Sequence, residues 1–174
     1  MKTEKLIICG PSGSGKDFLQ RELVKKGLKF NPKITTRPKR KFEIEGQDYF
    51  FINNSEFDKM NELGEIFTYQ SFKIVDQIWH YAISTENFNT NQLFIMTPHE
   101  INQISKEVRK KCFVVYLDID RQIRKARVCR REDMNDSVDR RFAADDIDFE
   151  GFSDYDMKVT DPEFDVEVIY DLMF

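Results

Sequence analysis

The sequence predicts an α/β protein with a parallel sheet covered by helices on both faces and a small inserted lobe that is mostly β. Three observations predict it. An apolar strand leads into a glycine-rich loop and a helix, strand and helix patterns alternate again after residue 91, and short strands with polar turns fill the stretch between. We expect one domain with its core at 1–29 and 92–174 and the lobe at about 30–91.

The glycine-rich loop follows an apolar run at 6–9 and precedes a helical pattern that ends near Gly27. Its backbone N–H groups, the helix N-terminus and the Lys16 ammonium would together hold phosphate, as in P-loop NTPases. The G-x-x-x-x-G-K loop therefore predicts a nucleotide phosphate site formed by Gly10, Pro11, Ser12, Gly13, Ser14, Gly15 and Lys16.

Asp17 stands where such a loop usually carries a Ser or Thr whose hydroxyl touches Mg²⁺. Two interpretations stay open. The carboxylate approaches a magnesium ion through water, or it is simply favourable in the first turn of a helix.

Composition excludes several classes of protein. The net charge of −4 argues against a generally basic nucleic-acid surface, and no apolar run has the length of a membrane span. Three cysteines without paired spacing are typical of a reducing cytosol. We expect a cytoplasmic protein with small-molecule partners, without nucleic-acid or membrane partners, and no pattern indicates its oligomeric state.

Further elements are expected from periodicity and capping residues. In the lobe we expect strands at 66–72 and 78–83 joined by a loop at 73–77, and a short helix capped by Asn54 or Ser55. Thr97 and Glu100 form a capping-box pattern. In the remaining core we expect strands at 92–96, 112–117 and 157–159, and helices at 120–131, 136–148 and 162–172.

The phosphate loop, together with Thr35-Thr36-Arg37, Arg40, Glu43 and Gly46-x-Asp48-Tyr49-x-Phe51, resembles the guanylate kinase family of nucleoside monophosphate kinases. The resemblance weakens after these motifs but stays collinear to the end of the chain. It implies transfer of the γ-phosphoryl group of ATP, with Mg²⁺, to GMP or dGMP.

The same resemblance implies a helical lid at about 127–141 and roles for individual residues. The acceptor phosphate would lie against Arg37, Arg40, Tyr49 and Tyr81, and the catalytic residues would be Lys16 with the lid residues Arg127, Arg131 and Arg141. Guanidinium forks and hydroxyl donors suit a phosphate dianion, although a solvated basic loop is the alternative for the first arginines. The acidic run at 145–150 is expected to be a solvated helix face.

The departures from the family pattern concern the acceptor base. Thr68, Ile83 and Pro98 stand at the three positions that read guanine in the family, and Met96 replaces an aspartate at a strand end. The loop spelling is also similar to that of ribose 1,5-bisphosphate phosphokinases. Three alternatives to a GMP kinase therefore remain: a kinase of another (deoxy)nucleotide, a kinase of a ribose phosphate, or a catalytically weak binding module.

Overall fold

A computed structural model describes residues 4–74, 77–130 and 137–172. The chain divides into two compact units, one formed by Met1–Leu28 with Leu93–Phe174 and the other by Lys29–Gln92. Each unit has its own sheet, and we call them the core unit and the lobe.

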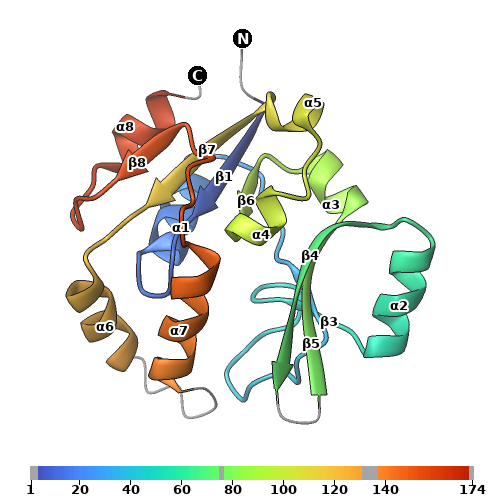
Figure 1. The fold of residues 1–174 in the computed structure, drawn as a ribbon. Helices are drawn as coiled ribbons and strands as arrows, with labels where there is room; N and C mark the ends of the chain where they lie inside the picture. The colour runs from blue at the N-terminus through green and yellow to red at the C-terminus, as the bar shows by residue number, and fades with distance from the viewer. Residues whose placement is uncertain (1–3, 75–76, 131–136, 173–174) are drawn as a thin grey trace. The chain divides into compact units, whose positions relative to one another are not determined.

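The core unit is built on a four-stranded sheet in the order β6-β1-β7-β8, in which every neighbouring pair is parallel (Figure 1). Its strands are β1 (Lys5–Cys9), β6 (Leu93–Ile95), β7 (Cys112–Leu117) and β8 (Met157–Val159). Leu6, Ile7 and Ile8 are fully buried. Parallel strands covered on both faces read as continuous apolar runs, which is why the sequence revealed them.

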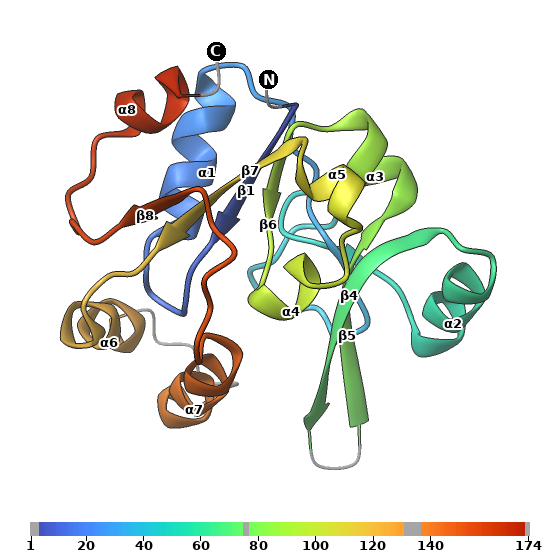
Figure 2. The same cartoon turned by 45° about the horizontal axis from the view of Figure 1, so that its top comes forward.

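Helices cover both faces of this sheet, as predicted. They are α1 (Lys16–Lys25), α4 (Pro98–Ile101), α5 (Lys106–Arg109), α6 (Arg121–Cys129), α7 (Val138–Asp148) and α8 (Val166–Asp171). Crossovers between parallel strands are right-handed, and the chain runs from β1 to β6 in one direction and from β6 to β7 in the other. Accordingly α1 and α8 pack together on one face, and α4 and α5 lie on the other (Figure 2).

Side-chain caps set where several of these helices begin. Thr97 and Glu100 form the predicted capping box of α4, and the Asp120 carboxylate accepts the N–H groups of Gln122 and Ile123 at the start of α6. The helix expected at 120–131 is described as far as Cys129, and the predicted Arg131 lies outside the described residues. The helix expected at 162–172 is shorter, because Asp165 caps it only at Val166.

The lobe contains a second four-stranded sheet in the order β3-β2-β5-β4. Its elements are β2 (Ile34–Thr35), β3 (Phe50–Phe51), α2 (Asn54–Glu62), β4 (Ile66–Ile74), β5 (Gln77–Ser84) and α3 (Thr85–Thr90). Two expectations were wrong. The loop expected at 73–77 is largely strand, because Lys73 pairs with Ile78 and Ile74 with Gln77, and the α2 cap is Asn53 rather than Asn54 or Ser55.

The two faces of the lobe sheet differ in character. On one face Phe57 of α2 packs against Ile34 and Ala82 and closes a small core. Side chains alternate across a strand, so Tyr81 and its cross-strand partner Gln70 point to the opposite face. Most of the predicted acceptor residues belong to this second face.

Candidate functional site

The phosphate loop follows β1 directly and is packed so tightly that only glycine fits at two of its positions. A Cβ on Gly13 would lie 2.5 Å from the Arg124 carbonyl oxygen, and Gly13 has a φ of 77°. A Cβ on Gly10 would lie 2.6 Å from Ser14 Oγ and 2.9 Å from the Leu117 carbonyl oxygen. The loop thus rests on the end of β7 and on α6, with its backbone drawn in as a phosphate cradle requires.

Lys16 lies over its own loop. Its Nζ donates hydrogen bonds to the carbonyl oxygens of Gly10, at 2.5 Å, and Pro11, at 3.0 Å. Among the described residues, the buried Ser14 hydroxyl has no hydrogen-bond partner. The Lys16 ammonium therefore lies against the first two residues of the loop, Gly10 and Pro11.

Two arginines of α6 contact the phosphate loop. Arg127 was predicted, and its guanidinium donates to the carbonyl oxygens of Gly13, at 3.3 Å, and Pro162, at 3.1 Å. Arg124 was not singled out, yet it is buried, and its Nη1 lies 3.4 Å from the Ser12 carbonyl oxygen. No local pattern distinguishes Arg124 from its basic neighbours, since burial depends on how α6 packs.

The remaining predicted lid arginine, Arg141, is half-buried in the first turn of α7, where its N–H donates to the Ser137 carbonyl oxygen. α7 packs beside α6 (Figure 1). The lid prediction as a whole remains a prediction, because it spans the undescribed stretch 131–136.

Asp145 corrects the expectation that the acidic run at 145–150 is a solvated face. Its side chain is only 17% exposed, and its Oδ2 accepts the backbone N–H of Ser12 in the phosphate loop at 2.8 Å. The adjacent Asp146 behaves as expected and pairs with Arg121 at the surface. A signal was available: Asp145 lies three residues after Phe142 and four before Phe149, on the inward stripe of the helix.

In the lobe, Arg37 is the centre of the predicted acceptor residues. It is 4% exposed and forms a bidentate pair with Glu43, with Nη2–Oε1 at 2.5 Å and Nη1–Oε2 at 3.0 Å. Its Nε donates to the Tyr81 hydroxyl at 3.1 Å, and its guanidinium lies 5.4 Å from the centre of the Tyr49 ring. Glu43 is part of the sequence motif but was not predicted as a site residue.

Burial and pairing act in opposite directions on this ion pair. Burial is the largest single influence and alone would lower the pKa of Arg37 and raise the pKa of Glu43. The hydrogen bonds and opposite charges of the pair, together with Tyr81 beside Arg37 and the Arg40 N–H on Glu43, jointly outweigh it. The net effect is a raised pKa for Arg37 and a lowered pKa for Glu43. Both groups are therefore charged at neutral pH, and the lobe presents a fixed guanidinium.

The other predicted acceptor residues lie around this pair or on the same face. Arg40 is half-buried and its N–H donates to Glu43 Oε2 at 2.7 Å, while the ring centres of Tyr49 and Tyr81 are 5.7 Å apart. Thr68 is fully buried opposite Ile83, and within the described part of the chain its hydroxyl has no hydrogen-bond partner.

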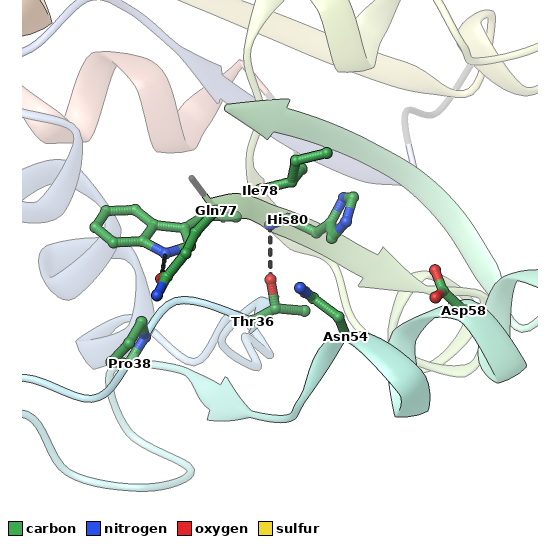
Figure 3. A pocket seen from close by; sticks show the side chains of 8 residues that line it. Thr36, Pro38, Asn54, Asp58, Gln77, Ile78 and His80 are labelled. Atoms are coloured by element: carbon green, nitrogen blue, oxygen red, sulfur yellow. Dashed lines mark hydrogen bonds between the residues drawn. The ribbon is translucent and has the colours of Figure 1, made fainter. Parts of the chain in front are cut away.

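A separate pocket of about 560 Å³ opens elsewhere in the lobe (Figure 3). Its floor includes the contact between the His80 N–H and the Thr36 hydroxyl, at 2.9 Å, and Asn54 and Asp58 of α2 form one side. Burial lowers the pKa of His80, partly offset by Asp58. None of the predicted acceptor residues lines this pocket, so it is distinct from the Arg37 cluster.

Comparison with known proteins decides the family. The family model of guanylate kinase matches residues 2–167. The chain belongs to the guanylate kinase family. The guanylate kinase of Thermotoga maritima is 48% identical over 67 residues, which are 37% of this chain and 32% of that protein. The guanylate kinase of Rhodopseudomonas palustris strain HaA2 is 46% identical over 61 residues, or 34% and 28% of the two chains.

The chain therefore spans about a third of the length of the curated relatives it matches. A crystal structure of guanylate kinase from Anaplasma phagocytophilum has the same fold, with a TM-score of 0.67 and 18% identity, over 99% of this chain and 82% of that one. The α/β architecture predicted from the sequence is thus confirmed, as is the family resemblance.

The described residues contain no group of three or more His, Cys, Asp or Glu side chains arranged to hold a metal ion. Within the same residues, no helix has both the length and the apolar character needed to cross a bilayer.

Proposed function

We propose that this member of the guanylate kinase family transfers the γ-phosphoryl group of ATP to a nucleoside monophosphate and forms the diphosphate. The observation that carries the proposal is a cation held in place in each unit, where it could bind an anion. Lys16 lies over a cradle of loop amides in the core unit, and Arg37 is fixed by Glu43 and Tyr81 in the lobe.

The loop at 10–16 would bind the donor phosphates. The Lys16 ammonium donates to two carbonyl oxygens of the loop itself. It could therefore exchange these oxygens for phosphate oxygens while staying at the loop. Phosphoryl transfer spreads negative charge over several oxygens, and catalysis consists mainly of positioning and charge stabilisation. Arg127 is already at the loop, and Arg131 and Arg141 are proposed to complete this role.

The lobe would bind the acceptor phosphate through Arg37, Arg40, Tyr49 and Tyr81. A guanidinium fixed by a carboxylate loses little freedom when it also binds a phosphate dianion. The acceptor oxygen is itself an anionic nucleophile, so no general base is required. Closure of the lobe and lid on the substrates would exclude water and limit hydrolysis of ATP.

Magnesium fits the donor set that the chain offers. In such kinases the ion keeps waters and binds substrate phosphates with only one or two carboxylates, so a cluster of three ligands is not needed. Asp17 is exposed in the first turn of α1, next to Lys16 in the sequence, and would hold the ion through water. When bound, Mg²⁺ neutralises charge on the β- and γ-phosphates.

GMP or dGMP is the first acceptor to test, because the family acts on guanine nucleotides. A different acceptor is the second candidate, and Thr68 and Ile83 favour it. At these two positions the family reads the base with polar groups, whereas here a short hydroxyl faces an aliphatic side chain and both are buried. An acceptor such as another (deoxy)nucleotide or a ribose phosphate would need no carboxylate at the positions of Thr68 and Ile83.

Lys16→Ala tests the kinase proposal against the alternative of a binding module. A kinase should lose phosphoryl transfer by orders of magnitude, because the lysine charge acts on the transferring group. A binding module should keep its partner. If the wild-type protein binds ATP and transfers nothing to a panel of monophosphates and ribose phosphates, the kinase proposal fails.

A further inference from the structure

The phosphate loop already holds an anion that belongs to the protein. Asp145 Oδ2 accepts the Ser12 N–H at 2.8 Å, across 133 residues of sequence. Loop amides of this kind are the groups that bind phosphate oxygens. The carboxylate therefore satisfies, in the ligand-free protein, a donor that an incoming polyphosphate would otherwise meet.

Lys16, which carries the opposite charge, is also hydrogen-bonded to groups of the protein. Its ammonium donates to the Gly10 and Pro11 carbonyl oxygens instead of pointing at open solvent. One amide of the loop is thus hydrogen-bonded to a carboxylate of the protein. Two of its carbonyl oxygens are hydrogen-bonded to an ammonium of the protein. Binding of a phosphate chain must exchange both sets of contacts.

We propose that Asp145 is a built-in competitor for the donor phosphates and sets the affinity of the loop for them. The proposal rests on the proposed function in one respect, namely that loop 10–16 binds the phosphates of the donor. A polyphosphate must displace the carboxylate from the Ser12 N–H, or bind beside a like charge at close range, and both reduce its affinity.

The structure also provides a second position for the displaced carboxylate. Arg124 Nη1 lies 4.0 Å from Asp145 Oδ2, just beyond a hydrogen bond. Arg124 is held in place by its Nε, which donates to the Ile119 carbonyl oxygen at 2.9 Å, and by packing on the Phe142 ring at 5.1 Å. A small movement of Asp145 from Ser12 to Arg124 would free the loop amide without exposing an unpaired charge.

This exchange would link the donor site to α7. Asp145 is carried by α7, and α7 packs against α6, which supplies Arg124 and Arg127 (Figure 2). Release of the Ser12 contact would remove a hydrogen bond that ties α7 to the loop.

The test is calorimetric titration of wild type, Asp145→Asn and Asp145→Ala with ADP and, separately, with inorganic tripolyphosphate, without added magnesium. Asp145→Asn keeps the shape and removes the charge. Asp146→Asn is the matched control, because it removes the same charge one residue away, where the side chain pairs with Arg121 at the surface. Thermal unfolding confirms that each variant is folded.

We expect both Asp145 variants to bind ADP and tripolyphosphate about tenfold more tightly than wild type, since a charged hydrogen bond no longer competes. The control should change affinity less than about twofold, as expected for a screened surface charge. Equal or weaker binding by both Asp145 variants overturns the inference, as does an equal gain in the control.

The outcomes also separate this inference from the proposed function. If tripolyphosphate binds with the expected ranking and ADP does not, the competitor role stands and the ATP donor falls. If ADP binds to wild type and variants alike, the donor stands and the competitor role falls. If neither ligand binds to any variant, both fall.

A measurement on the backbone adds a readout that activity cannot give. The Ser12 amide resonance should move when Asp145 is replaced by Asn, and tripolyphosphate should move the same resonance in the wild-type protein. No movement of this resonance in Asp145→Asn would show that the carboxylate does not occupy the amide in solution, and would overturn the inference.

Discussion

Replacing Glu43 by Gln should destabilise the lobe and remove the charged partner that fixes Arg37. Glu43 is the partner of Arg37, with side-chain exposures of 14% and 3%, and two hydrogen bonds join them. A glutamine keeps the shape and one acceptor oxygen but leaves the buried guanidinium without its counter-charge.

The expected cost follows from this geometry. Breaking a buried ion pair by removing one partner costs about 3–5 kcal/mol. The glutamine oxygen can still accept one hydrogen bond, so we expect a loss of about 2–3 kcal/mol in the free energy of unfolding of the lobe. The Tyr81 hydroxyl, 3.1 Å from Arg37 Nε, cannot replace the lost charge.

The assay uses the single tryptophan of the chain, Trp79, which belongs to β5 of the lobe. Its fluorescence during urea unfolding follows the lobe, whether or not the core unit unfolds in the same transition. The matched control is Glu62→Gln, an exposed side chain in the last turn of α2, which should change the free energy by less than about 0.5 kcal/mol.

The stability difference between wild type and Glu43→Gln should depend on pH in a definite direction. The pKa of Glu43 is lowered from its ordinary value of 4.5, so its stabilising contribution is complete above that value and is lost as the pH falls through the folded-state pKa. The difference between wild type and Glu43→Gln should be constant above about pH 5 and should shrink below about pH 4. Equal stability at pH 7, or a difference that grows in acid, would refute the account of this pair.

Two further predictions concern the core unit. Gly13→Ala should lower the free energy of unfolding by at least about 2 kcal/mol more than Gly27→Ala. Both residues have positive φ, but of the two only a Cβ on Gly13 would meet a backbone oxygen, at 2.5 Å. Similar losses for the two variants in thermal or urea unfolding would contradict the packing of the loop. Burial raises the pKa of the Cys112 thiol to about 11, and Cys9 is fully buried, whereas Cys129 is exposed on α6. A disulfide reagent at about pH 8 should therefore react rapidly with one thiol and with all three only after denaturation. Two rapidly reacting thiols would contradict the burial of Cys9 or Cys112.

Local chemistry made much of the fold predictable. The apolar run at Cys112–Leu117 is the strand β7 residue for residue, and the Thr97–Glu100 capping box starts α4 where expected, since both depend on neighbours in the sequence. The phosphate loop is equally local. The predicted length of the β4–β5 hairpin was too short, because the outer part of the hairpin depends on cross-strand pairs such as Lys73 with Ile78. The sequence of one strand alone does not reveal such pairs.

The features that the sequence could not reveal depend on contacts between distant segments. The bond from Ser12 to Asp145 requires α7 to pack at the phosphate loop, and the burial of Arg124 requires α6 to lie under the same loop. The pair of Arg37 with Glu43 is different, because these residues are only six positions apart and the turn between them brings their side chains together. For Asp145 and Arg124, long-range packing rather than residue type determines the surroundings of the charged group.

Phosphorus NMR of the products tests the central claim most directly. The wild-type protein, with ATP and Mg²⁺, would be given GMP, dGMP, other nucleoside monophosphates and ribose phosphates one at a time, beside Lys16→Ala. The account predicts ADP and one newly phosphorylated acceptor in equal amounts from the wild type, and loss of both by orders of magnitude in the variant. ATP binding without any new phosphorylated product, or equal product from Lys16→Ala, would contradict it.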